Sequence, residues 1–339
     1  MGRPAHPVAG LTAVAPWPRK LAILWLSLVV LTALLAAVLP LPYPPGIPDL
    51  AHVAQSPFIA GGSGPGRHWL GTDPQGRDVL STLVFGARTA VLLTLPAALL
   101  AALVGAVAGG AAGFWGNTVR VAVPYWLLAA GGGWWALGLP LPIAALALSL
   151  GGGALALAAR WRNYALPAWP VPINAVVMGL ATTLDTIPRL VLVVALAAST
   201  DVTVPGLLAL LALTAWPHSA RLVRAQMLRV RALPFVEAAR AAGLPASQTW
   251  LRHALPHTLQ PLRTALPLSI AGLLGLESTL SFLGIGLPPD VASWGRLLAT
   301  VREEPGAWWA FIPPTILLSV IILSLITISP SPALSYRKS

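Results

Sequence analysis

The sequence predicts an all-α membrane protein that crosses the bilayer several times. Of its 339 residues, 56% are hydrophobic and only 9% are charged. Soluble domains carry about 25% charged residues, so this chain has too few charges to cover a water-facing surface of its size. Apolar runs of about 20 residues, the length that a helix needs to cross the hydrocarbon core, recur along the chain. The sequence contains no cysteine, which excludes disulfides and thiolate metal sites.

Eight windows with few or no charges are long enough to be membrane-spanning helices. The third and fourth form one apolar stretch of about forty residues, too long for a single span. Gly138, Pro140 and Pro142 favour a break in its middle, which predicts a helical hairpin. The first window is too long for a typical signal peptide and has no clear cleavage site, so an uncleaved anchor is expected. The expected spans are 21–39, 89–113, 121–138, 141–159, 173–199, 204–220, 264–286 and 311–328.

The basic residues predict the orientation, because cytoplasmic segments of membrane proteins are enriched in Lys and Arg. If the N-terminus is cytoplasmic, the cytoplasmic segments hold most of the basic residues and Glu237 as their single acid, whereas the other side holds more acids than bases. The net charge of +11 therefore comes from the excess of basic residues in the cytoplasmic segments. Because this excess is explained by membrane orientation, nucleic-acid binding is not expected. We therefore expect a cytoplasmic N-terminus (1–20), an extracytoplasmic loop (40–88), a cytoplasmic loop (221–263) and a cytoplasmic tail (329–339).

The cytoplasmic loop holds the first functional motif. Pro234 opens a short alanine-rich helix that stops at Gly243, a position that often needs a positive φ. Composition alone fits either an ordinary interfacial helix pair or a slim helix that inserts into a groove of another protein. However, the spacing Glu-Ala-Ala, three residues, Gly, nine residues, His-Ala-Leu-Pro resembles the EAA loop of ABC-importer permeases, which docks into cytoplasmic ATPase subunits. By this resemblance, the docking residues are Glu237, Ala238, Ala239, Gly243, His253, Leu255 and Pro256.

Two further segments resemble signatures of the dipeptide, oligopeptide and nickel importers of this family. Residues 68–81 match an extracytoplasmic motif, with a turn expected at 73–76 and Asp78 expected near the N-terminus of the following helix. Residues 277–286, followed by Ser293-Trp294-Gly295, resemble the matching segment of the C-type subunit. The first motif contributes Gly71, Thr72, Asp73, Gly76, Arg77 and Asp78.

Three charged residues fall within predicted spans, where charges are costly and therefore candidates for function. Asp185 and Arg189 are four residues apart, so on one continuous helix they can neutralise each other. A structural ion pair and a role in the substrate pathway or gate both remain open for them. For Glu277, a role in gating or subunit contact and a role in simple helix packing both remain open. His253 and His257 do not form a zinc-protease motif, because Ala254 follows the first and Pro256 interrupts the helix, so no metal site is expected.

The resemblance implies a permease domain over 89–328, with a six-span core into which 118–172 is inserted as the two-helix hairpin. It implies a subunit that moves peptides, nickel or a similar small solute across the inner membrane. The expected partners are a second permease subunit in a heterodimer, two ABC ATPase subunits and an extracytoplasmic substrate-binding protein. The sequence contains no phosphate-binding P-loop, so ATP and Mg²⁺ are expected on the ATPase partners, and no cofactor is expected here.

Two other classes of protein fit the sequence less well. A polytopic membrane enzyme requires polar residues that converge near one membrane face, and the predicted spans offer few. A passive channel leaves the large basic cytoplasmic loop unexplained.

Overall fold

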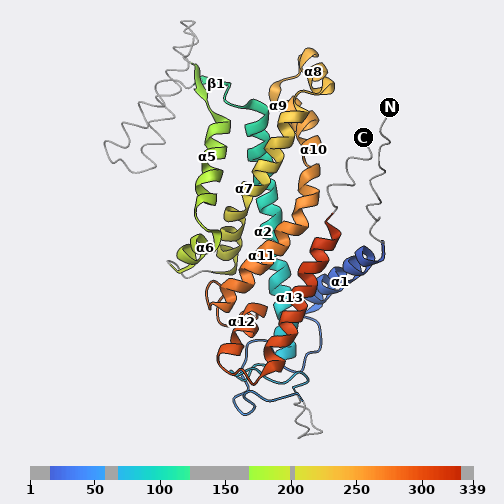
Figure 1. The fold of residues 1–339 in the computed structure, drawn as a ribbon, viewed down its shortest axis with the longest axis vertical. Helices are drawn as coiled ribbons and strands as arrows, with labels where there is room; N and C mark the ends of the chain where they lie inside the picture. Colours follow the sequence, from blue (N-terminus) through green and yellow to red (C-terminus); the bar gives the residue numbers. More distant parts are fainter. Residues whose placement is uncertain (1–15, 58–67, 123–167, 199–202, 330–339) are drawn as a thin grey trace, which may run out of the picture.

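The computed structural model describes residues 16–57, 68–122, 168–198 and 203–329 and is almost entirely helical in these ranges. Figure 1 shows the long helices running mainly along the long axis, with α8 and α12 at opposite ends. The fold is therefore that of an all-α polytopic membrane protein, as predicted. Within the described ranges, the single helices long and apolar enough to cross a membrane are α1 (Pro16–Leu35), α2 (Val79–Trp115), α7 (Val204–Val230), α11 (Gln260–Phe282) and α13 (Trp308–Ile328).

The expected span at 173–199 is not a single straight helix. It consists of α5 (Ile173–Thr186) and α6 (Arg189–Ala198), which meet at a bend of 84°. Between them, Ile187 has an extended backbone, with φ −88° and ψ 128°. This conformation is the one favoured before proline, because the ring of Pro188 clashes with a helical predecessor. The pair is a broken span or a re-entrant segment, which corrects the prediction of one continuous helix.

Most of the two predicted hairpin spans, residues 123–138 and 141–159, lies outside the described residues, but the base of the insertion is described. There the prediction of a helix from Val121 is wrong, because Val121 and Ala122 belong to a strand. β1 (Val119–Ala122) pairs with β2 (Ala168–Val171) in an antiparallel ribbon. Next to the ribbon, the Asn174 N–H donates to the Gly116 carbonyl at 3.0 Å, and the Ala175 N–H donates to Asn117 Oδ1 at 3.1 Å. The C-terminal end of α2 and the start of α5 are thus held together directly.

The central contact of the fold is between α2 and α7. Gly105, Gly109 and Gly113 recur every fourth residue and therefore lie on one face of α2. A Cβ atom on Gly109 would lie 2.1 Å from the carbonyl oxygen of Ala220, and one on Gly113 would lie 2.7 Å from Cβ of Met227. Small residues permit this close approach of helix backbones, which stabilises helix pairs where no hydrophobic effect acts between them.

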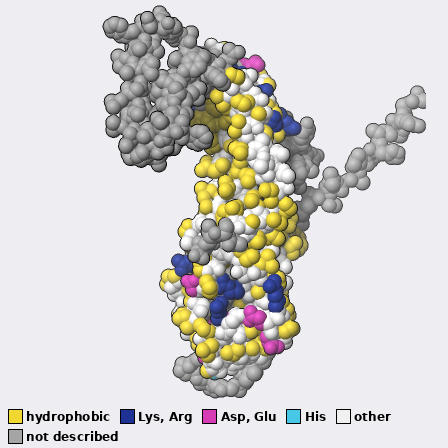
Figure 2. Space-filling view, turned by 90° about the vertical axis from the view of Figure 1, so that its left-hand side faces the viewer, with side chains coloured by type: hydrophobic (Ala, Val, Ile, Leu, Met, Phe, Trp, Pro, Cys, Tyr) yellow, Lys and Arg dark blue, Asp and Glu magenta, His cyan; other side chains and the backbone are white. Residues whose placement is uncertain are grey.

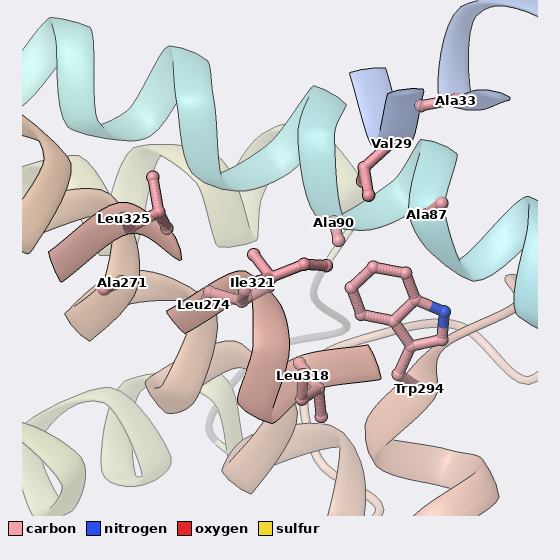
Figure 3. Close-up of a cluster of buried hydrophobic side chains, with 10 residues drawn as sticks. All are labelled: Val29, Ala33, Ala87, Ala90, Ala271, Leu274, Trp294, Leu318, Ile321 and Leu325. Atoms are coloured by element: carbon pink, nitrogen blue, oxygen red, sulfur yellow. The ribbon is translucent and has the colours of Figure 1, made fainter. Parts of the chain in front are cut away.

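A second contact region surrounds Trp294, the first residue of α12 (Trp294–Ala299). Figure 3 shows its indole ring beside Ala90 of α2 and near Ile321 of α13. The indole N–H donates to the Leu83 carbonyl at 2.9 Å. A Cβ atom on Gly86 would lie only 2.6 Å from the ring, so the glycine makes room for the tryptophan.

The outer surface agrees with a lipid environment. On the face drawn in Figure 2, hydrophobic side chains cover the middle, and charged side chains gather toward the ends. Several leucines of the long helices are exposed in the isolated chain, such as Leu24 (67%) on α1 and Leu103 (62%) on α2. Large exposed apolar surfaces of this kind mark contact with lipid or with another protein.

Candidate functional site

The segment that resembles the EAA loop forms a compact element at the end of α2 and α7. α8 (Pro234–Ala241) buries one face, through Val236 and Ala239, and leaves the rest of its surface open. Val236 belongs to a buried cluster with Phe114 of α2 and Met227 of α7. The guanidinium of Arg240 also lies over the Phe114 ring, 5.2 Å from its centre. The element is therefore packed firmly onto the two central helices.

Gly243 ends α8 in the way its position predicts. Its φ is +77°, in the left-handed region that other residues avoid, so this prediction is confirmed. The Gly243 N–H donates to the Arg240 carbonyl at 3.0 Å, and the Leu244 N–H donates to the Ala239 carbonyl at 3.2 Å. These two bonds form a Schellman motif, which satisfies the last carbonyls of the helix and turns the chain sharply.

The second helix of the element is divided into three short pieces. They are α9 (Ala246–Gln248), the π-helix η1 (Thr249–Ala254) and α10 (Leu255–Thr258). The Leu255 N–H donates to the Trp250 carbonyl five residues earlier. We attribute this widening to Pro256, which has no N–H and whose ring clashes with the preceding turn of an ordinary α-helix.

The element exposes an apolar surface with one acid. Glu237, Ala238, Gly243 and Pro256 are exposed, whereas His253 and Leu255 are partly buried. Four large apolar side chains are exposed beside them, and apolar patches of this kind mark protein interfaces. Their exposed fractions are 42% for Leu233, 38% for Phe235, 36% for Leu244 and 57% for Leu251.

At the other end of α2, the 68–81 segment forms the predicted turn. Oδ1 of Asp73 accepts the N–H groups of Gln75 (3.0 Å) and Arg77 (2.7 Å), and Gly76 has φ +79°. Asp73 is 2% exposed. Burial raises the pKa of Asp73 above its usual value, and the backbone hydrogen bond from Arg77 is the largest influence in the opposite direction.

Asp78 caps α2, as predicted, because its Oδ2 atom accepts the Ser81 N–H at 2.7 Å. The neighbouring part of the motif packs on α13. The Thr72 carbonyl accepts the indole N–H of Trp309 at 3.0 Å. A Cβ atom on Gly71 would lie 2.9 Å from the same ring, and Gly71 has φ +74°, so a glycine is needed there.

Glu277 lies in α11 and is 2% exposed. Its carboxylate accepts hydroxyl hydrogen bonds from Ser281 (2.8 Å), Ser293 (3.0 Å) and Ser278 (3.3 Å). Ser293 in turn caps α12 by accepting the Gly295 N–H at 3.2 Å. This arrangement ties α11 to α12, and in the isolated chain it favours the packing role over the gating role.

The three motifs occupy the two ends of the molecule. Trp294 joins the 68–88 segment to the 277–295 segment through its contacts with Leu83 and Gly86. The element formed by α8, η1 and α10 lies at the opposite end of α2 (Figure 1).

Asp185 and Arg189 do not form the ion pair that their spacing suggested. They lie on opposite sides of the 84° break between α5 and α6, so the geometry of a continuous helix does not apply. Asp185 pairs instead with Arg221 of α7. Arg189 donates to Thr214 Oγ1 at 3.2 Å and to the Leu211 carbonyl at 3.3 Å. Both residues thus anchor the bent pair to α7.

Sequence reasoning missed one group of polar residues. In the part of the chain that the structure describes, Asp49, His52 and His68 bring three possible metal-ligand atoms within 4.8 Å of one another. The Asp-x-x-His spacing of the first two residues was the available signal. It is weak, because the third member comes from a separate segment that folding brings alongside.

The sequence is similar to proteins of known families. Residues 168–330 match the family described as the inner membrane component of binding-protein-dependent transport systems. Residues 168–330 of this chain carry the inner-membrane domain of such a system. The resemblance to ABC-importer permeases is thereby confirmed, and the permease is a multi-pass protein of the inner membrane.

Three relatives extend this result beyond the matched domain. The permease is 28% identical to a protein of Brucella suis named as a peptide permease, over 88% of this chain and 82% of that protein. A second B. suis protein, named as a peptide transport system permease, is 28% identical over 76% of this chain and 69% of that one. A peptidoglycan transport system permease of Agrobacterium fabrum is 29% identical over 75% of this chain and 54% of its own length.

Proposed function

We propose that the permease is the C-type subunit of an importer that moves peptides into the cytoplasm with energy from ATP. The names of its Brucella relatives support the peptide class. The observation that carries the proposal is the exposed surface of α8, with the spacing of the EAA loop, on top of the central helix pair. In this proposal separate ATPase subunits dock at that surface, and they bind and hydrolyse ATP at sites of their own. A second permease subunit and an extracytoplasmic substrate-binding protein complete the importer.

The proposed orientation follows from the positions of the basic residues. The 221–263 loop and both termini face the cytoplasm, and the 40–88 loop and the 277–295 segment face the outside. With the hairpin at 118–172 included, the chain has eight spans, two of them added to a six-span core. The 168–330 family match begins at the end of that insertion, which supports its assignment as an addition.

The proposed mechanism uses the rigid connection between α8 and the central helices. α7 runs from Val204 to Val230, and α8 follows at Pro234. The Arg231 guanidinium donates to the Gly113 carbonyl of α2 at 2.9 Å. When the ATPases close, they displace α8, and this contact moves α7 and α2 together. Such rocking of packed helices exposes the substrate pathway to each side in turn.

A single introduced cysteine tests both the orientation and the ATPase partner. Because the native chain has no cysteine, Ser247→Cys provides one thiol on the exposed side of the element. We expect a membrane-impermeant maleimide to label it only after the membrane is opened, and we expect it to crosslink to a co-expressed ATPase subunit. Glu304→Cys, exposed at the other end, is the matched control and should label from outside without ATPase crosslinking. Labelling of Ser247→Cys from outside, or no crosslink to the ATPase, contradicts the proposal.

Removal of the insertion is expected to leave a working permease. If Asn117 is joined directly to Ile173, the existing 3.0 Å bond from the Asn174 N–H to the Gly116 carbonyl becomes the closing bond of a four-residue β-turn. The shortened chain should therefore insert, bind its ATPases and retain most of its transport of a labelled peptide. The measurement is uptake into cells or vesicles beside the full-length chain.

The alternative outcome is equally clear. If the shortened permease inserts and binds its ATPases but transports nothing, the hairpin belongs to the pathway or its gate. In that case a six-span mechanism does not describe this protein.

A further inference from the structure

His68 faces a carboxylate at each of its two ring nitrogens. Its Nδ1 atom lies 2.9 Å from Oδ1 of Asp78, and its Nε2 atom lies 3.5 Å from Oδ2 of Asp49. The side chains of His68 and Asp78 are only 2% and 1% exposed. A neutral imidazole has a single N–H and can donate to one carboxylate alone. We assign that proton to Nδ1, because its contact is the shorter and the more deeply buried.

This assignment leaves two electron-pair acceptors facing each other. Nε2 of His68 then presents its lone pair to the Asp49 carboxylate across 3.5 Å. Such an arrangement is repulsive unless a positive charge lies between the two atoms. A second imidazole points to the same place, since Nδ1 of His52 is 2.9 Å from the same Oδ2 atom of Asp49.

We propose that Asp49, His52 and His68 bind a divalent metal ion of the Zn²⁺ class. In a tetrahedral zinc site with bonds of about 2.0 to 2.1 Å, neighbouring ligand atoms are separated by about 3.3 Å. Oδ2 of Asp49 lies 2.9 Å from His52 Nδ1 and 3.5 Å from His68 Nε2, on either side of that value, and all three ligand atoms lie within 4.8 Å of one another. Two imidazoles and one carboxylate are a ligand set that zinc accepts, with a fourth position left for water.

The surroundings of these residues have the features of a metal site. The Asp78 carboxylate accepts a hydrogen bond from Nδ1–H of His68. Metal-binding histidines are usually oriented by a carboxylate in this way. The Tyr43 ring stacks on His68 with 3.9 Å between the ring centres. The backbone of the other two ligands is also fixed. The Asp49 N–H donates to the Gly76 carbonyl at 2.7 Å, and the His52 carbonyl accepts the Thr72 hydroxyl.

The ion would join two segments that are distant in the sequence. Asp49 and His52 lie in the loop after α1, whereas His68 precedes the cap of α2. Metal binding would therefore fasten this loop to the start of the central helix, close to the 68–81 motif. The site is independent of ATPase docking at the opposite end, so it can be present or absent whatever the fate of the proposed function.

The test is zinc binding by the full-length chain, purified in lipid nanodiscs with a tag that contains no histidine. We expect about one bound Zn²⁺ per chain by elemental analysis, and a melting temperature that rises with Zn²⁺, because a ligand that binds the folded state stabilises it. Mg²⁺ should cause no such rise, since it prefers sites built of oxygen ligands. A chelator-dye competition then gives the dissociation constant for Zn²⁺.

Three variants separate metal binding from folding. His52→Ala removes a ligand whose side chain is 48% exposed, so the metal-free protein should melt as the native chain does. The affinity for Zn²⁺ should fall more than tenfold in His52→Ala and also in Asp49→Asn, because each variant loses a ligand. Asp78→Asn, which changes the residue that orients His68, should lower the affinity by about 10- to 100-fold. His218→Ala, an exposed histidine of α7, is the control and should change nothing.

Two results would overturn the proposal. One is the absence of stoichiometric Zn²⁺ binding by the native chain. The other is undiminished affinity in both His52→Ala and Asp49→Asn.

Discussion

Gly243→Val is expected to abolish substrate-stimulated ATP hydrolysis by the assembled importer while leaving membrane insertion intact. Gly243 has φ +77°, and a left-handed conformation costs an ordinary residue about 1–2 kcal/mol and a β-branched residue more. The variant should relieve this strain by giving up the Schellman turn. The exposed face of α8 would then no longer be held in the orientation that the ATPase groove requires.

Gly243→Asn is the matched control, because asparagine tolerates the left-handed region. A Cβ atom at this position has no neighbour within 4 Å, so space is available for either side chain and backbone conformation alone distinguishes the two variants. The Asn variant should keep most of the stimulation. Glu237→Lys, which reverses the exposed acid of α8, should also lose coupling. ATPase activity of reconstituted complexes, with and without substrate and binding protein, is the measurement. Normal stimulation in both Gly243→Val and Glu237→Lys would show that this element does not couple ATP hydrolysis to transport.

Gly109→Ala is expected to have the largest effect on the stability of the fold. The added Cβ atom would lie 2.1 Å from the Ala220 carbonyl oxygen and 2.8 Å from its Cα atom. These are backbone atoms of a packed helix, so no side chain can rotate away, and α2 and α7 must separate along their length. Overpacking of this kind costs about 1–3 kcal/mol, or more where the backbone has to move. We expect a value at the upper end of that range and a clear fall in melting temperature in detergent.

Gly272→Ala provides the comparison within the same chain. Gly272 is an exposed residue of α11, and a Cβ atom there meets nothing within 4 Å. Alanine is favoured over glycine inside a helix by about 0.8–1.0 kcal/mol, so this variant should be as stable as the native protein or more so. If Gly109→Ala melts at the same temperature as Gly272→Ala, close backbone contact between α2 and α7 does not stabilise the permease.

Much of the local structure near the motifs could be predicted from short stretches of sequence. The left-handed turn at Gly243 and the cap at Asp78 each depend on a few adjacent residues. Backbone sterics and the unsatisfied N–H groups at a helix start dictate such features wherever they occur. The bend between α5 and α6 was not predicted, because 173–199 was expected to be one continuous span, although the residue before Pro188 is disfavoured in a helix. The 84° angle of the bend is a tertiary feature, since packing against α7 sets the direction in which α6 leaves.

The sequence by itself determined that this protein is a helical membrane protein and that three of its segments resemble motifs of importer permeases in their family order. Apolar length and motif spacing are properties of the chain that need no folded partner. Tertiary structure alone decided which distant residues meet. It paired Asp185 with Arg221 rather than with Arg189, placed Trp294 against Gly86, and brought Asp49 and His52 beside His68. These contacts depend on how helices and loops pack in space, and spacing along the chain does not encode that packing.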